Sequence, residues 1–412
     1  MRLLLHLMSR IAKFILPRKV YDWLFFKFLN FLGRKRQSNK SRKYRYLKNL
    51  PKGVNLFSYF NMKNSAAVEG RLLQQMLEDA GIPYHLIDLD DPQCISNMGV
   101  ELYNVNLIIS HVSNKLEFYT LLAGIDLGKY YNIGYMAWEL PSLPDSLCAS
   151  LNMFQEMWTL SSFCTSALEK KATVPVLTVP LFADSNRTVI ENGREYFGFN
   201  QDIFLFMLAY DCNSFVSRKN PQAAVEAFMK AFSPQERNVG LVIKLSYPEK
   251  YKEHINELQK MLKPYPNIYF IDKYLTDEEM RTLIQVSNAF VTLHRSEGFG
   301  LVPLEAMSLG TPVISTAWSG NMEYMTHMNT ALVGYQMVPV AGQYVGSIPG
   351  DDLVWAEPDV NEAAAHMRRM VTDAEWRENL ITNGKHTAIE CYNATSISKV
   401  LRDRLQVLQL IE

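Results

Sequence analysis

Residues 289–315 constrain the fold more than any other part of the chain. An apolar run over 289–293 predicts a buried strand, and a second run over 311–315 predicts another. Between them lie a loop with two glycines and a short helical segment. In that segment Pro303 fits the first helical position, and Gly310 fits the position just past the helix end. This order of strand, loop, helix and strand is typical of an α/β domain with a parallel sheet.

The loop before this helix predicts a site for a diphosphate. Its backbone N–H groups and the positive end of the helix can hold an anion at the mouth of the sheet. Glu297 precedes the helix and Glu305 is expected in its first turn, so both carboxylates should lie near the same helix end. Carboxylates accept hydrogen bonds from hydroxyl groups, which suits a sugar and a ribose. The alternative is an ordinary βα unit with acidic capping residues.

Three segments of this region match a known pattern in register: Glu-Gly-Phe-Gly at 297–300, Pro-Leu-Glu-Ala at 303–306 and Gly-Thr-Pro-Val-Ile at 310–314. Together they resemble the signature of retaining glycosyltransferases of the GT-B fold, specifically glycosyltransferase family 4. The resemblance extends over residues 52–395. It implies an α/β protein with two doubly wound Rossmann-like domains facing across a cleft. It also implies retaining transfer of a sugar from a UDP- or GDP-sugar to a glycan or lipid-linked acceptor, with no cofactor and no catalytic metal.

The resemblance assigns roles to individual residues. Arg-Lys-Asn-Pro at 218–221 follows an Asp and a Ser, as in family 4, and Lys244 ends a predicted strand. Glu305 is expected to hold the ribose, and Glu297 to orient the sugar. The residues expected to bind the nucleotide-sugar donor are Arg218, Lys219, Lys244, Gly298, Phe299, Gly300, Leu301, Val302 and Glu305. Fixed cations and a helix N-terminus would stabilise the charge left on the diphosphate when the glycosyl–phosphate bond breaks.

Glu297, Glu139 and His111 are the candidate catalytic residues. Glu139 belongs to a Trp-Glu-Leu element that resembles a subset of family 4, where it would lie near the sugar or the acceptor hydroxyl. Alternatively, Trp138 is a core residue and Glu139 caps a helix. His111 ends a predicted strand and is expected to reach the cleft, although a lone histidine is more often structural. His294 is interpreted as a residue that fixes the loop.

Residues 61–71 depart from the family pattern. Relatives carry a glycine-rich loop after the first strand, whereas this segment has a single glycine, Gly70. The sequence therefore leaves open whether this backbone closely approaches a ligand. The acidic run at 88–91 resembles metal-binding acids of other glycosyltransferases, but it precedes a proline and is interpreted as a turn.

The chain of 412 residues is long enough for two domains. From residue 54 onward, apolar strands alternate with helical patterns. The prediction places an acceptor-side Rossmann-like domain at 51–185, a nucleotide-sugar domain at 195–390 and a C-terminal helix at 391–412 that crosses back. Residues 338–358 are rich in glycine and proline and are expected to form a long loop.

Residues 1–50 form a basic, aromatic segment with 14 Lys and Arg residues and one acid, Asp22. The cations interrupt every apolar run, so neither a spanning helix nor a signal peptide is predicted. The favoured interpretation is a segment that lies on an anionic membrane surface; the alternative is packing on the protein or on a partner. Nucleic acid is not an expected partner, because the aromatic residues form apolar blocks instead of isolated stacking platforms.

These features predict a cytoplasmic protein that is peripheral on the inner face of the membrane and acts in cell-surface polysaccharide biosynthesis. The five cysteines are scattered without metal-binding spacing, which favours a reducing compartment. Two other classes of function remain open. A GT-B nucleotide-sugar epimerase or phosphorylase would share the diphosphate site, and a non-catalytic membrane-associated scaffold would not bind nucleotide sugars.

Overall fold

The structure is a computed structural model that describes residues 49–62, 64–89, 101–109, 127–144, 148, 151, 154–184, 188–340 and 353–412. The chain divides into two compact units. The N-terminal unit comprises residues up to 181 together with 342–351 and 394–412, and the C-terminal unit comprises 182–341 and 352–393. Except for its last two residues, the basic segment 1–50 lies outside the described residues. In the described part of the chain, no helix is both long and apolar enough to span a bilayer.

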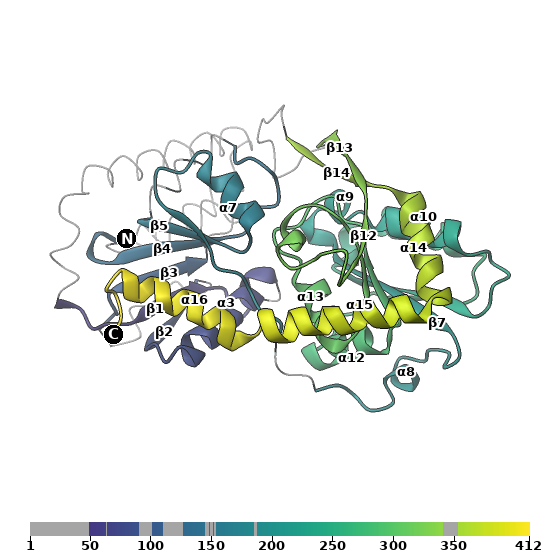
Figure 1. The fold of residues 1–412 in the computed structure, drawn as a ribbon, viewed down its shortest axis with the longest axis horizontal. Coiled ribbons are helices and arrows are strands. Elements are labelled where there is room, and N and C mark those ends of the chain that lie inside the picture. Colours follow the sequence, from purple (N-terminus) through teal and green to yellow (C-terminus); the bar gives the residue numbers. More distant parts are fainter. Residues whose placement is uncertain are drawn as a thin grey trace. The chain divides into compact units, whose positions relative to one another are not determined.

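The N-terminal unit is built on a parallel sheet of six strands in the order β2-β1-β3-β4-β5-β6 (Figure 1). The strands are β1 (Val54–Ser58), β2 (Tyr84–Asp88), β3 (Val105–Ile109), β4 (Tyr131–Met136), β5 (Glu156–Thr159) and β6 (Val176–Thr178). Every residue of β1, β3, β4 and β5 is buried, as expected for central strands covered on both faces.

Three buried asparagines run across the centre of this sheet. Asn55, Asn106 and Asn132 occupy equivalent positions on β1, β3 and β4. The Asn55 Nδ2 donates to Asn106 Oδ1 at 2.8 Å, and the Asn106 Nδ2 donates to Asn132 Oδ1 at 2.9 Å. Because each amide satisfies its neighbour, the polar groups are tolerated in the core, and they fix the strand register.

Helices α3 (Ser65–Asp79), α7 (Ser162–Glu169) and α16 (Ala394–Val407) belong to the N-terminal unit. Asn64 caps α3 by accepting a hydrogen bond from the Ala67 N–H at 3.0 Å. Gly70 lies inside α3, and a Cβ at this position would be 2.5 Å from the Ser58 Oγ of β1. The single glycine of the 61–71 segment therefore allows a helix to pack closely on a strand. Helix α16 packs against α3 (Figure 1).

The C-terminal unit contains a second parallel sheet of six strands, in the order β12-β11-β10-β7-β8-β9. The strands are β7 (Phe204–Asp211), β8 (Val239–Ser246), β9 (Ile268–Ile271), β10 (Ala289–Thr292), β11 (Val313–Thr316) and β12 (Ala331–Val333). These two parallel-sheet α/β domains confirm the predicted fold class.

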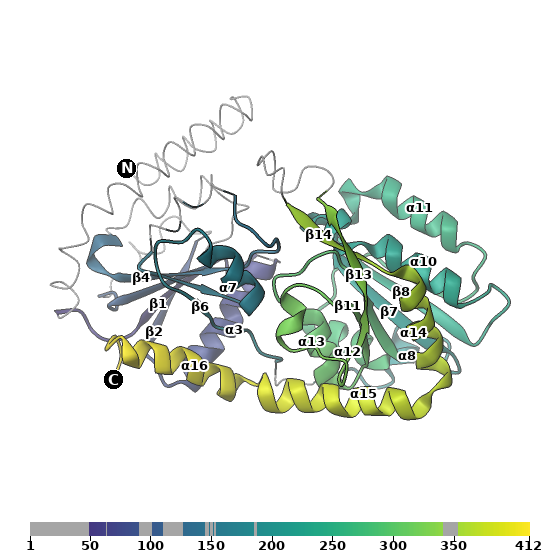
Figure 2. The ribbon, with the colours of Figure 1, turned by 45° about the horizontal axis from the view of Figure 1, so that its top comes forward.

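Helices cover both faces of this second sheet (Figure 2). One hydrophobic core joins the sheet to α10 (Pro221–Ala231), α11 (Lys252–Leu262) and α14 (Val360–Thr372). On the other side, α13 (Leu301–Leu309) packs against both α12 (Asp277–Val286) and α15 (Ala374–His386). The short helices α8 (Gly193–Tyr196) and α9 (Val216–Lys219) complete the unit.

Three local predictions were wrong. Helix α13 begins at Leu301, so Pro303 is its third residue and Glu305 lies in its second turn. The helix starts earlier because Gly300, with a φ of 83°, takes the left-handed conformation that ends the loop. The expected loop at 338–358 includes most of an antiparallel pair, β13 (Tyr335–Pro339) and β14 (Val354–Pro358). Strand β14 forms because tertiary burial of Trp355 (2% exposed) outweighs the local glycine and proline content.

Candidate functional site

The candidate site lies at the carboxyl ends of adjacent strands in the C-terminal unit. Arg218 and Lys219 follow β7, Lys244 lies near the end of β8, Glu297 follows β10 and Gly320 follows β11. These four strands are neighbours in the order β11-β10-β7-β8. In parallel α/β sheets, ligands bind outside the carboxyl ends of the strands.

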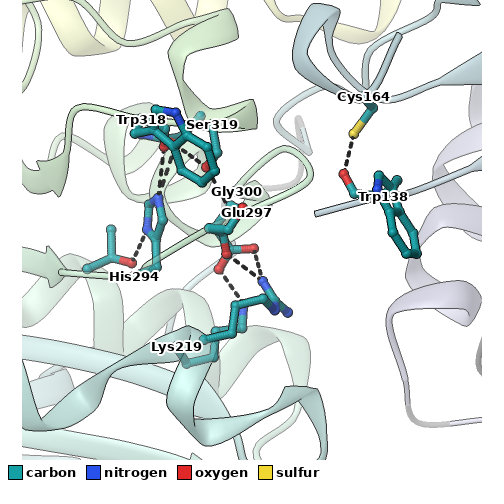
Figure 3. Close-up of polar contacts among 12 residues, drawn as sticks. Trp138, Cys164, Lys219, His294, Glu297, Gly300, Trp318 and Ser319 are labelled. Carbon is teal, nitrogen blue, oxygen red and sulfur yellow. Dashed lines mark hydrogen bonds and ion pairs between the residues drawn. The ribbon is translucent and has the colours of Figure 1, made fainter. Parts of the chain in front are cut away.

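Glu297 forms ion pairs with both cations that follow β7 (Figure 3). Its Oε2 is 3.1 Å from Arg218 Nη1, and its Oε1 is 2.5 Å from Lys219 Nζ. Arg218 is 4% exposed and also donates to the Ser296 carbonyl at 2.7 Å. Burial opposes ionisation of Glu297, but Lys219 and Arg218 outweigh it and hold the pKa of this carboxyl well below its usual range. Without ligand, the site therefore holds an anion of its own.

The backbone of the loop 297–300 is fixed by residues that follow β11. The Glu297 N–H donates to the Ser319 Oγ at 2.8 Å, and the Gly320 N–H donates to the Glu297 carbonyl at 2.9 Å. The buried Tyr324 hydroxyl donates to the Gly300 carbonyl. Gly300, the N-cap residue of α13, has no side chain that could cap the helix, and Leu301 and Val302 carry its first N–H groups.

His294 supports the loop 297–300 through hydrogen bonds to neighbouring segments. It is fully buried, and burial lowers its pKa, so the ring is neutral near pH 7. The Asn321 Nδ2 donates to the Thr316 carbonyl, so Asn321 Oδ1 is left to accept from His294 Nε2 at 3.0 Å. The Nδ1 then accepts from the Thr292 hydroxyl at 3.0 Å. This network holds the segment after β11 against β10, which is the loop-fixing role predicted for His294.

Lys244 lies on β8, two residues before the end of the strand. It is 5% exposed, and burial lowers its pKa. Its Nζ donates to the Leu245 carbonyl and the Ser246 Oγ, both at 3.0 Å. Asp211, at the end of β7, is within electrostatic reach of Lys244, Lys219 and Arg218. Burial nevertheless raises the pKa of Asp211, and these cations only oppose the rise. The sequence analysis gave Asp211 no role in the site.

Strand β14 adds a second support that the sequence analysis missed. The Arg295 guanidinium pairs with Glu357, with Nε 2.5 Å from Oε2, and Nη1 donates to the Ser217 carbonyl at 2.6 Å. The Arg295 N–H donates to the Arg218 carbonyl at 2.7 Å, and its own carbonyl accepts from the Ala356 N–H at 3.0 Å. Arg295 therefore joins the segment that carries Arg218 to β14.

Glu305 lies on α13, partly exposed. Burial raises the pKa of Glu305 to about 8, and the negative charges of the nearby Asp184 and Asp277 contribute to this rise. A carboxyl group at this position can accept hydrogen bonds from hydroxyl groups, as the predicted contact with a ribose requires.

The other two candidate catalytic residues, Glu139 and His111, precede the C-terminal unit in the chain. Glu139 follows β4 in the N-terminal unit, where Trp138 is buried and donates from Nε1 to the Ser142 carbonyl at 3.0 Å. The Cys164 thiol donates to the Trp138 carbonyl at 2.9 Å (Figure 3). Trp138 is therefore a core residue that holds the chain around Glu139. His111 lies outside the described residues.

Comparisons with known proteins address the fold and the function. Residues 208–387, which contain the whole candidate site of the C-terminal unit, match the family Glycosyl transferases group 1. The structure of Anabaena HepE in complex with UDP and glucose has a TM-score of 0.63 at 13% identity, covering 86% of this chain and 100% of that one. Sucrose-phosphate synthase from Thermosynechococcus elongatus has a TM-score of 0.62 at 14% identity, covering 87% and 99%. The fold is GT-B.

A sequence relative supports the same class of protein. An uncharacterized glycosyltransferase of Methanocaldococcus jannaschii is 25% identical over 187 residues, which are 45% of this chain. The match spans 42% of that relative's length. Together with the family match, these findings support a GT-B glycosyltransferase.

Gly320 offers a direct test of the loop support. A Cβ at this position would lie 2.0 Å from the Gly298 carbonyl oxygen, so Gly320→Ala must displace the loop of the GT-B site. We expect kcat/KM for sugar transfer to fall about 100-fold, because misplacement by about 1 Å has that effect. Gly384→Ala is the matched control, since its Cβ would meet ordinary contacts at 3.5 Å. Equal activity of the two variants would contradict the proposed role of Gly320.

Proposed function

We propose that this protein is a retaining glycosyltransferase that uses a nucleotide-diphosphate sugar as donor. The observation that supports this most strongly is the cluster of Arg218, Lys219 and Glu297 in front of the α13 N-terminus. Two fixed cations, Lys244 and a helix end can stabilise a diphosphate leaving group. The partly buried carboxylate beside them can accept hydrogen bonds from sugar hydroxyls.

In the proposed reaction, the bond between the anomeric carbon and the diphosphate oxygen breaks, and the electron pair stays on the diphosphate. Arg218, Lys219, Lys244 and the N–H groups of α13 stabilise this charge. The acceptor oxygen attacks from the face of the leaving group, and its proton passes to a phosphate oxygen. Glu297 orients the sugar and Glu305 contacts the ribose. With the charge taken by protein groups, the proposed transfer proceeds without a catalytic metal.

The donor class can be found by thermal-shift measurements with UDP-, GDP- and ADP-sugars in the presence of EDTA. Stabilisation by one class is expected, by about 2.7 kcal/mol when the ligand is at 100 times its Kd. EDTA should not reduce either this stabilisation or the transfer rate. Absence of stabilisation by every nucleotide sugar would refute the proposal and favour a non-catalytic scaffold. Turnover of the donor without an acceptor would instead favour an epimerase.

The acceptor is proposed to be a glycan or a lipid-linked precursor of a cell-surface polysaccharide at the cytoplasmic face of the membrane. The support is the net charge of +13 over residues 1–50, interleaved with aromatic clusters. The full-length protein should float with anionic liposomes at low salt, whereas the protein without residues 1–50 should not. Equal flotation of the two proteins would refute the membrane role of this segment.

A further inference from the structure

Glu297 forms ion pairs with two of the cations that a donor diphosphate is proposed to bind. The carboxylate is 14% exposed and bridges Arg218, which is 4% exposed, and Lys219, which is 21% exposed. A diphosphate that binds Arg218 and Lys219 competes with Glu297 for these two side chains, because both anions are attracted to the same positive charges. Binding of a diphosphate must therefore weaken or break the two ion pairs.

The displaced carboxylate cannot move far to find other partners. Its backbone N–H is bound to Ser319, and its carbonyl accepts from the Gly320 N–H. The neighbouring Gly298 is in close contact with Gly320, and Tyr324 holds Gly300. A partly buried carboxylate that loses its cations pays a large desolvation cost unless new donors replace them. The hydroxyl groups of a sugar attached to the diphosphate would be such donors.

We infer that Glu297 makes the site discriminate between a nucleotide sugar and the bare nucleoside diphosphate. This inference rests on the proposed function. With a nucleotide sugar, the diphosphate takes Arg218 and Lys219 while the sugar hydroxyls bind the released carboxylate. With the bare diphosphate, the carboxylate has no replacement donor and competes for the cations. The product of transfer is consequently bound more weakly than the donor, which favours its release.

The test measures Kd by calorimetry for UDP and UDP-glucose, or for GDP and GDP-mannose if the thermal shifts select that class. In Glu297→Gln, the side chain keeps its shape but no longer neutralises the cations. We expect the affinity for the bare nucleoside diphosphate to rise at least tenfold. The affinity for the nucleotide sugar should change by less than threefold or fall, so the preference for the sugar form should shrink at least threefold. Glu297→Ala should show the same loss of preference if the glutamine variant folds poorly.

Two further variants make the result specific. In Glu297→Gln combined with Lys219→Met, the gain in nucleotide affinity should be lost, because one of the freed cations is gone. Glu236→Gln breaks a different carboxylate–guanidinium pair, in which Glu236 Oε2 is 2.6 Å from Arg368 Nη1, and should leave both affinities unchanged. An unchanged preference in Glu297→Gln, or weaker binding of the bare diphosphate, would overturn the inference while leaving the proposed function intact. If the wild-type protein binds no nucleotide at all, the proposed function fails and the inference fails with it.

Discussion

Replacing Arg218 with methionine is expected to lower kcat/KM for sugar transfer about 1,000-fold, the upper range for loss of one fixed group that stabilises developing charge. The reason is the burial of the guanidinium, which is 4% exposed and held by the Ser296 carbonyl and by Glu297. A charge fixed in this way needs little rearrangement when the leaving group becomes negative. Initial-rate kinetics with the donor class identified by thermal shift would measure the effect.

The control is Arg369→Met, which removes an arginine of the same unit that pairs with Asp373 at the surface. This variant should keep wild-type kinetics. Arg218→Lys should recover only part of the lost activity, since an ammonium cannot reproduce the fork of the guanidinium. Activity of Arg218→Met within threefold of the wild type would show that Arg218 does not contact the reacting phosphate.

Replacing Arg404 with methionine is expected to destabilise the N-terminal unit by about 3–5 kcal/mol, the usual result of leaving a buried charge without its partner. Glu156, on β5, is completely buried. Arg404, on α16, donates from Nε to its Oε1 at 2.9 Å and from Nη2 to its Oε2 at 2.5 Å. This hydrogen bonding also raises the pKa of Arg404, so the guanidinium stays charged. Urea unfolding monitored by circular dichroism would measure the loss.

The matched double variant separates the effect of an unpaired buried charge on stability from the effect of lost packing. Glu156→Gln combined with Arg404→Met should recover most of the stability, because no uncompensated charge remains in the core. Arg369→Met, which breaks an exposed ion pair, should change the stability by less than about 1 kcal/mol. If Arg404→Met were as stable as Arg369→Met, the pair would not anchor α16 to the sheet.

Most elements of the candidate site could be predicted because their signals are local. The apolar run before the Glu-Gly-Phe-Gly loop and the glycine at 310 mark the ends of β10 and α13. Gly310 has a φ of 83° and ends α13, as predicted, since a residue without Cβ adopts this conformation at low cost. The start of α13 was misplaced by two residues, because Gly300 and Pro303 both carry helix-start signals and the sequence does not rank them.

The supports of the site could not be predicted, because they depend on contacts between distant segments. Strand β14 has little local signal of its own, yet it reaches Arg295, more than 50 residues earlier in the chain, and orders the segment that carries Arg218. The close approach of Gly320 to Gly298 likewise exists only after β10 and β11 pair. A glycine needed for such an approach has the same sequence signal as a glycine in an ordinary turn.

The sequence by itself determined the alternation of strands and helices, the helix end that is proposed to bind the diphosphate, and the residue types at the site, because periodicity, capping and turn chemistry act over a few neighbouring residues. Only the tertiary structure decided how those groups are paired. Glu297 and the two cations are nearly 80 residues apart in the chain, and their contact arises from the side-by-side placement of β7 and β10. The charge state of the ligand-free site follows from this placement, since the energy of an ion pair depends on distance and burial, which a linear pattern does not contain.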